Sequence, residues 1–220
     1  MMRPTYEYVI RPTPTRRVSF GRVELVNIGM ALGALTLVFV LVWVNPLFGS
    51  IPLEAGVIGI VVASSFVAVL TGFLMHEIAH KVVAVRYGLW AEFRADTRGL
   101  LLAFVTAIFG FVIAAPGAVM IAGPVNLRQN GRISAAGPLT NMAFGGSFLA
   151  ILFAFWPVLY FTPWFILVYQ IAIVNIILGT FNMIPVPPLD GSKIWWWKKP
   201  VWAGIFAVFV VMFAVFFIYL

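Results

Sequence analysis

The stretch that decides the fold is residues 56–85, GVIGIVVASSFVAVLTGFLMHEIAHKVVAV. It is long enough to cross a bilayer as a helix, since a span needs about 20 mostly apolar residues. Near its end stand both histidines of the chain, in His76-Glu77-Ile78-Ala79-His80. On a helix, positions i and i+4 share a face, so the two imidazoles can bind one metal ion with Glu77 beside them. Because ionisable residues are costly in a membrane, this HExxH motif indicates function.

The composition is that of an integral membrane protein. Hydrophobic residues make up 63% of the 220 residues and charged residues only 10%. There is no cysteine, which excludes disulfides, thiolate ligands and thiol nucleophiles. The net charge of +7 comes from basic residues at the ends of apolar segments, a pattern typical of membrane orientation. We therefore expect a lipid bilayer as a partner and no nucleic acid.

About five apolar segments are predicted to cross the membrane, which indicates an all-α polytopic protein. They are residues 26–48, 56–85, 134–160, 164–184 and 201–220. The first is too long for the apolar core of a signal peptide, so we expect an uncleaved anchor. We predict an amino-terminal arm over residues 1–22, on the cytoplasmic side, and a single membrane-embedded domain over residues 23–220.

The segment after the HExxH helix is predicted to hold short β-strands and a re-entrant or interfacial element. Residues 92–96 alternate polar and apolar side chains, which favours a strand, whereas residues 100–115 are apolar but marginal in length for a crossing. If they crossed, Arg128 and Arg132 would lie on the opposite side from the basic residues before them. If they enter and leave on one side, all basic residues share that side. The positive-inside rule therefore predicts a cytoplasmic amino terminus and a cytoplasmic active-site face.

The third ligand of a catalytic zinc must come from an acidic residue. Such a site usually has three protein ligands and an open position, and the chain offers two histidines and no cysteine. Five acidic residues are assigned to the amino-terminal arm, to the loop on the opposite side or to the solvated strand: Glu7, Glu24, Glu54, Glu92 and Asp96. Asp190, in Pro188-Leu189-Asp190-Gly191, emerges on the same side as the histidines. It is favoured over Glu92 and Asp96, and a tight Pro-Gly turn without a metal is its alternative.

Three motifs together resemble the site-2 protease family, polytopic zinc proteases that cut transmembrane segments of other proteins. They are the HExxH motif, Gly137-Pro138-Leu139-Thr140-Asn141, and Asn182-Met183-Ile184-Pro185-Val186-Pro187-Pro188-Leu189-Asp190-Gly191, in the expected order. The resemblance covers about residues 57–195, which we take as the core of the domain.

This resemblance implies an intramembrane endopeptidase with one Zn²⁺ per chain. It implies that His76, His80 and Asp190 are the ligands, that Glu77 is the catalytic carboxylate, and that Asn182 contacts the oxyanion or the substrate. The substrate is expected to be a membrane protein with a transmembrane helix. For Asn141, hydrogen bonding between helices is the ordinary role, and contact with substrate is the alternative.

A helical substrate must be unwound before its peptide bond can be attacked, because its backbone groups already bond each other. An edge strand could then hold the extended segment by strand addition. The candidates for this clamp are residues 91–97, with Phe93 as a substrate contact, and residues 117–123.

Two other classes of protein are weighed against the enzyme. A zinc-binding membrane scaffold would keep the histidines, but nothing would require Glu77 between them. A metal transporter should distribute polar groups along several spans, whereas the ionisable groups gather at one end of the membrane. The substitution Glu77→Gln separates these classes, because it should spare zinc binding and abolish only catalysis.

Overall fold

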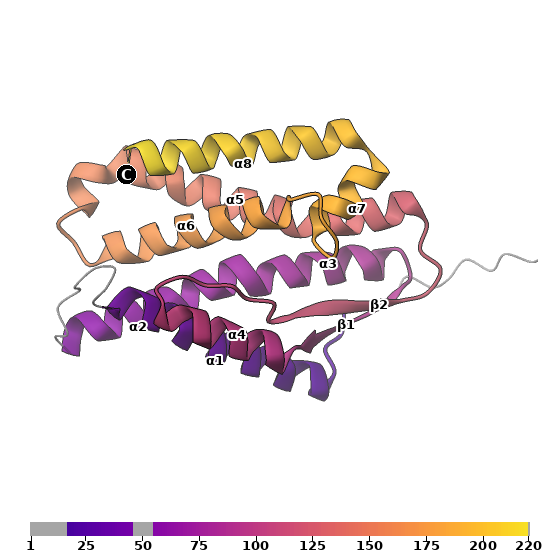
Figure 1. Cartoon of the computed structure of the whole chain (residues 1–220), viewed down its shortest axis with the longest axis horizontal. Helices are drawn as coiled ribbons and strands as arrows, with labels where there is room; N and C mark the ends of the chain where they lie inside the picture. Colours follow the sequence, from indigo (N-terminus) through magenta and orange to yellow (C-terminus); the bar gives the residue numbers. More distant parts are fainter. Residues whose placement is uncertain (1–16, 46–54, 220) are drawn as a thin grey trace, which may run out of the picture.

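Long apolar helices build the molecule, and the computed structural model describes residues 17–45 and 55–219. Within these ranges, five helical stretches are long and apolar enough to cross a membrane, which confirms the predicted number and order. They lie alongside each other, with a two-stranded sheet at one end (Figure 1). The predicted arm falls mostly on residues 1–16, outside the described part of the chain.

The helices follow one another with short connections. Their bounds are α1 Arg22–Val44, α2 Ala55–Val69, the π-helical turn η1 Leu70–Leu74, α3 Met75–Arg86, α4 Thr97–Ile108, α5 Leu127–Leu159, α6 Trp164–Asn182, α7 Asp190–Trp197 and α8 Lys199–Tyr219. The second predicted span is thus α2, η1 and α3 in continuation. The π-helical turn stands immediately before the HExxH motif, where π-bulges often mark functional sites.

Helix α5 begins earlier than the predicted span over residues 134–160. Asn126 Oδ1 accepts a hydrogen bond from Gln129 N at 2.9 Å, and Gln129 Oε1 accepts one from Asn126 N at 3.1 Å. This reciprocal capping box satisfies two backbone donors that have no partner inside the helix. The helix therefore begins at Leu127 rather than near Ser134.

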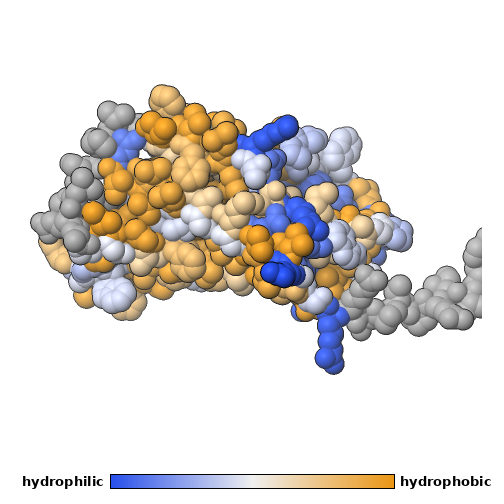
Figure 2. All heavy atoms as spheres, turned by 90° about the horizontal axis from the view of Figure 1, so that it is seen from below, coloured by the Kyte–Doolittle hydropathy of each residue, from blue (hydrophilic) through white to orange (hydrophobic). Residues whose placement is uncertain are grey.

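The segment between the second and third spans has a re-entrant shape, as the charge distribution predicted. Helix α4 follows α1 away from the sheet, and Asn45 Nδ2 donates to Ile108 O at 2.9 Å near the far end of α1. The chain then returns to the sheet (Figure 1). There Asp96 N donates to Pro116 O at 2.9 Å, so both ends of the segment meet. On the face in Figure 2, hydrophilic residues gather toward this end and apolar residues cover most of the rest.

Two strands form the sheet beside the HExxH helix. Strand β1, Trp90–Ala95, pairs in antiparallel fashion with β2, Gly117–Ala122, and places Phe93 opposite Val119. Gly117 has a φ of +141°, and a Cβ there would collide with the Arg94 carbonyl, so glycine is required at this point. The predicted short strands are therefore confirmed, and they pair with each other in one antiparallel ladder.

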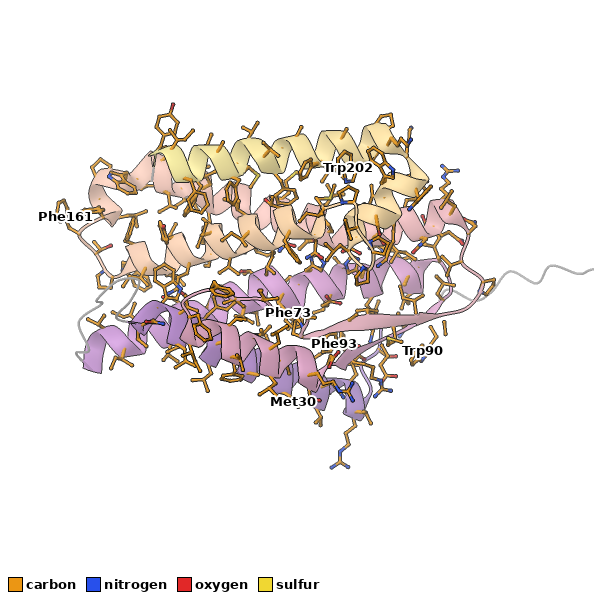
Figure 3. All side chains as sticks on the ribbon, in the orientation of Figure 1. Met30, Phe73, Trp90, Phe93, Phe161 and Trp202 are labelled. Carbon is orange, nitrogen blue, oxygen red and sulfur yellow. The ribbon has the colours of Figure 1, made fainter. Side chains whose placement is uncertain are left out.

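Two apolar clusters hold the bundle together. One lies among α2, α5, α6 and α8 and is built from residues such as Leu152, Ile171, Ile176 and Phe216. The other lies among α1, η1, α4 and the sheet, where the Phe73 and Phe93 rings meet edge to face with centroids 5.5 Å apart (Figure 3). This second cluster attaches the sheet to the span that carries the HExxH motif.

A buried ion pair connects α1 to α3 and to the sheet, and it corrects the assignment of Glu24 to the amino-terminal arm. Glu24 lies in α1 with 1% of its surface exposed, and Lys81 Nζ lies 2.6 Å from its Oε1. The same Oε1 accepts the Phe93 N–H at 3.0 Å. A lysine inside a span needs a buried acidic partner, so Lys81 was the signal that sequence reasoning missed.

Candidate metal centre and active site

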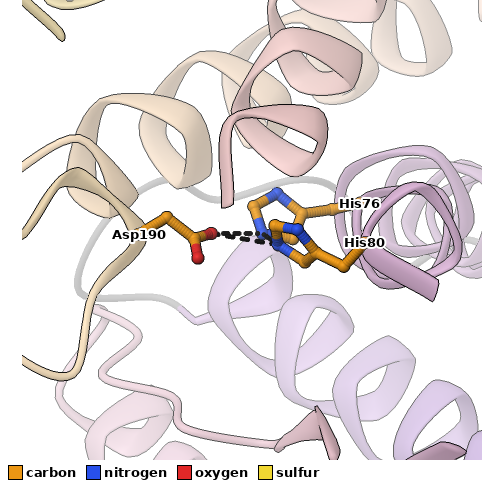
Figure 4. Close-up of side chains that lie close together, drawn as sticks. All are labelled: His76, His80 and Asp190. Atoms are coloured by element: carbon orange, nitrogen blue, oxygen red, sulfur yellow. Dashed lines mark hydrogen bonds and ion pairs between the residues drawn. The ribbon is translucent and has the colours of Figure 1, made fainter. Parts of the chain in front are cut away.

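The two histidines of α3 and the first residue of α7 converge on one point (Figure 4). His76 Nε2 and His80 Nε2 lie 2.9 Å apart, because the residues are one helical turn apart on one face. Asp190 Oδ2 lies 3.2 Å from His76 Nε2 and 3.0 Å from His80 Nε2. All three residues are buried, and in the described part of the chain they are the only such cluster of potential metal ligands.

Asp190 reaches this point from a helix rather than from the tight turn that the sequence suggested. It opens α7, which follows the proline-rich segment after α6. The next residue must be small, because a Cβ at Gly191 would collide with the Met183 carbonyl. The close approach of α7 to the end of α6 therefore aims the Asp190 carboxylate at the histidines.

The outer nitrogen of each imidazole contacts an oxygen that can accept a hydrogen bond. His80 Nδ1 lies 2.7 Å from Ile133 O, a carbonyl, which can only accept, so Nδ1 carries a proton, and in the neutral ring Nε2 then has the lone pair. His76 Nδ1 lies 2.5 Å from Asn141 Oδ1, which demands the same tautomer. Both Nε2 atoms therefore present lone pairs to each other and to Asp190.

Three acceptor atoms this close repel one another unless a proton or a metal ion lies between them. Two imidazole nitrogens and one carboxylate oxygen form a donor set of catalytic zinc sites, so the residues present fit this ion.

Gly137 of α5 closes the opposite side of the cluster. A Cβ at this position would lie 2.5 Å from both His76 Nε2 and His80 Nε2. The space in front of the two nitrogens is therefore kept by the absence of a side chain. This observation explains why a glycine stands in the Gly137-Pro138-Leu139-Thr140-Asn141 motif at this point.

Glu77 stands beside the cluster, at the outer edge of β2. Alternate N–H groups of a strand point to opposite edges, and Phe93 N and Ala95 N point away from β2, to Glu24 and Asn27 of α1. Val119 and Gly117 lie opposite Phe93 and Ala95, so their N–H groups point away from β1. Val119 N donates to Glu77 Oε2 at 3.1 Å, and the side chains of both residues line a small cavity between α1, α3 and the sheet.

Asn141 makes hydrogen bonds between helices, which was one of its two predicted roles. The residue is fully buried, and its amide bonds His76, Gly72 O and Asn175 Oδ1. One of these bonds goes directly to a residue of the metal cluster. The other predicted role, contact with a substrate, stays a prediction.

Phe93 is buried in the structure, and its predicted contact with a substrate stays a prediction. Its side chain is 2% exposed and packs on Phe73, and its N–H is taken by Glu24. The outer edge of β1 is thus covered by α1. Of the two predicted clamp segments, only β2 turns an edge toward Glu77.

Asn182 lies at the end of α6 and is half-buried. Its Nδ2 donates to Leu178 O of its own helix at 3.0 Å. Among the described residues, none of the hydrogen bonds joins Asn182 to the histidines, Glu77 or Asp190. Its predicted contact with an oxyanion or a substrate stays a prediction.

Comparison with known proteins connects this site to a family. The model of "Peptidase family M50" matches residues 159–198. "Putative zinc metalloprotease MJ0611" of Methanocaldococcus jannaschii is 41% identical over 145 residues, which cover 63% of this chain and 72% of that protein. "Putative zinc metalloprotease Rip3" of Mycobacterium tuberculosis is 32% identical over 134 residues, or 60% of this chain but 30% of its own length. "Putative zinc metalloprotease YwhC" of Bacillus subtilis is 31% identical over 158 residues, covering 58% of this chain and 65% of that protein. No solved structure matches the chain.

Proposed function

This chain belongs to peptidase family M50, the site-2 protease family, and on that premise we propose that it cuts peptide bonds in or near transmembrane segments of other membrane proteins. It is a multi-pass membrane zinc metalloprotease. The observation that carries the proposal is the position of the site. The metal cluster and Glu77 lie at the end of a span and beside the open edge of a strand.

In the proposed mechanism, His76, His80 and Asp190 hold the zinc ion. A bound zinc ion supplies Lewis acidity, which activates water at neutral pH and polarises a peptide carbonyl. Glu77 takes the proton of the attacking water and returns it to the departing amine, as general base and then general acid. Glu77 follows His76 on the first turn of α3, and this adjacency places its carboxylate beside the metal cluster.

Asn182 is proposed to stabilise the oxyanion. An amide suits a site of low dielectric constant because it donates a hydrogen bond without carrying charge. To do so, its Nδ2 must leave Leu178 O, to which it now donates. The end of α6 connects through a short segment to Asp190, which supports a place for Asn182 near the reacting bond.

The substrate is proposed to bind as an extended strand along the outer edge of β2, which consists of Gly117, Val119 and Ile121. The N–H groups of these residues point away from β1, toward α3. A substrate carbonyl that accepts the Val119 N–H would replace Glu77 Oε2 as its partner and release the carboxylate. Strand addition at this edge therefore brings the unwound peptide next to the catalytic group.

The active-site end of the bundle is proposed to face the cytoplasm. The basic residues that the structure describes lie in the helix ends and loops near the sheet, whereas the connection between α5 and α6 has none. Because the chain has no cysteine, single cysteines report sidedness directly. In intact cells, a membrane-impermeant maleimide should label Thr162→Cys and spare Arg128→Cys; the reverse pattern contradicts the orientation.

The decisive test of function is Glu77→Gln. We expect purified Glu77→Gln protein to keep its zinc, measured by mass spectrometry, and to lose cleavage of a transmembrane reporter. The matched control is Glu92→Gln, which removes a carboxylate of β1 that pairs with Arg94 away from the metal cluster. Comparing membrane proteomes of the two strains would then identify substrates. Full cleavage by Glu77→Gln would remove Glu77 from the catalytic role, whereas a wild type that binds zinc and leaves the reporter uncut would refute the protease and favour the scaffold.

A further inference from the structure

We propose that Asn175 is a positioning residue that, through Asn141, sets the tautomer of His76. Asn175 lies on α6 and contacts neither the metal cluster nor the edge of β2 through any hydrogen bond among the described residues. This inference rests on the metal-binding role proposed for His76. It concerns how the zinc site is prepared, not which bond is cut.

The two asparagine amides form a chain of hydrogen bonds that ends on His76. Asn141 Nδ2 donates to Gly72 O at 2.7 Å and to Asn175 Oδ1 at 3.0 Å, while Asn141 Oδ1 faces His76 Nδ1. Asn175 Nδ2 donates to Ile171 O at 2.8 Å and to Thr71 Oγ1 at 3.1 Å. Both asparagines are fully buried, so no water competes for these bonds.

Backbone carbonyls fix the direction of the whole chain. Gly72 O and Ile171 O can only accept, so the group of each amide that faces them must be its NH₂. Rotating the Asn175 amide by half a turn would set its oxygen against Ile171 O and its NH₂ against the NH₂ of Asn141. Rotating the Asn141 amide would set its oxygen against Gly72 O. In a buried site either conflict leaves unpaired polar groups, which is costly.

The consequence is that only an oxygen faces His76 Nδ1. The imidazole must therefore carry its proton on Nδ1 and keep a lone pair on Nε2, which points to His80 and Asp190. With the opposite amide orientation, Nε2 would carry the proton and the ligand position would be blocked. A hydrogen bond to the outer nitrogen of a ligating histidine orients the ring and is worth about 10–100-fold in metal affinity.

The π-helical turn η1 supplies the anchoring groups on the side of the HExxH span. Thr71 and Gly72 both lie in it, and Thr71 Oγ1 donates to Val67 O at 2.9 Å, which leaves a lone pair for Asn175. A Cβ at Gly72 would lie 2.9 Å from Val174 Cγ1. Glycine therefore lets α6 approach closely enough for Asn175 to complete the chain.

The test measures the tautomer and the zinc affinity of the full-length protein in detergent. The chain has only two histidines, so ¹⁵N labelling of histidine reports on His76 and His80 alone. In the zinc-free wild type both rings should be protonated at Nδ1. In Asn141→Leu, His76 should populate the Nε2-protonated form, and in Asn175→Leu, where Gly72 O still holds the Asn141 amide, it should do so to a smaller extent. His80, held by Ile133 O, should not change in either variant. Chelator competition should give about 10–100-fold weaker zinc binding.

Two further variants distinguish positioning from general damage. Gln170→Leu removes a buried amide of the same helix, which bonds Ser65 and neither of the two asparagines. This variant should leave the His76 tautomer and the zinc affinity at wild-type values. Asn141→Asp keeps an oxygen toward His76 Nδ1 and should retain the Nδ1-protonated form, so it remains informative if a leucine variant does not fold.

The inference is overturned if Asn175→Leu leaves the His76 signals and the zinc affinity unchanged. It is equally overturned if Gln170→Leu shifts them as much, or if Asn141→Asp shifts the tautomer like Asn141→Leu. Failure of the proposed function looks different: the wild type would bind no zinc or cut no substrate, while the tautomers of the two rings would still be measurable.

Discussion

Replacing Lys81 with methionine should cost far more stability than the loss of an ordinary surface ion pair. The Lys81 side chain is 3% exposed and that of Glu24 is 1% exposed, so the substitution leaves a buried carboxylate without its cationic partner. One donor, the Phe93 N–H, would still reach it. Removing one partner of a buried ion pair typically costs about 3–5 kcal/mol, and we expect a loss in free energy of unfolding of that size.

Two comparison variants make this magnitude specific. Arg94→Met removes the partner of Glu92 in a pair whose arginine side chain is 41% exposed, and it should cost less than about 1 kcal/mol. The double variant Glu24→Gln/Lys81→Met leaves no buried charge, and the glutamine oxygen can still accept the Phe93 N–H. It should therefore recover most of the stability that Lys81→Met alone loses.

The measurement is unfolding in mixed micelles followed by tryptophan fluorescence, for which the chain offers eight tryptophans. Activity should fall together with stability in Lys81→Met, because Glu24 and Phe93 attach the sheet whose edge borders Glu77. The reasoning is refuted if Lys81→Met costs no more than Arg94→Met. It is also refuted if the double variant is as unstable as Lys81→Met, because the stranded charge would then not be the cause.

Four further predictions concern the site itself. Gly137→Ala should abolish zinc binding, seen as metal content near zero, because its Cβ would lie 2.5 Å from both imidazole Nε2 atoms; normal zinc content would show that the helix shifts freely. Ile121→Pro should remove an outward N–H of β2 without touching the β1–β2 ladder, and so reduce cleavage at least about tenfold with zinc retained, whereas Ile121→Ala should have a small effect. Asn182→Ala should lower kcat by about 10²–10³-fold at constant zinc content, as measured for donors to an oxyanion; an unchanged kcat would remove Asn182 from the mechanism. Treatment with a chelator should abolish cleavage, and added Zn²⁺ should restore it, with zinc content and reporter cleavage followed in parallel.

Much of the site was predictable because its spacing is local. The i, i+4 separation of His76 and His80 determines by helix geometry alone that both rings share one face. The apolar length of the spans and the positions of the basic residues indicated the polytopic fold and the re-entrant shape of α4 and its return. The start of α5 was predicted too late in the chain, although Asn126 and Gln129 have the spacing of a capping box.

Contacts between distant parts of the chain were decided only in three dimensions. The sequence on its own determined which residue types could hold zinc and that Asp190 was the favoured third ligand, but the distance between Asp190 and the histidines depends on how α7 packs against α6. The pairing of Lys81 with Glu24, the cover of β1 by α1, and the bonds of Asn141 to His76 and Asn175 all join residues more than 30 positions apart. Local spacing is set by backbone geometry that every helix shares, whereas such contacts depend on which faces of several helices pack together, and that is a property of the whole bundle.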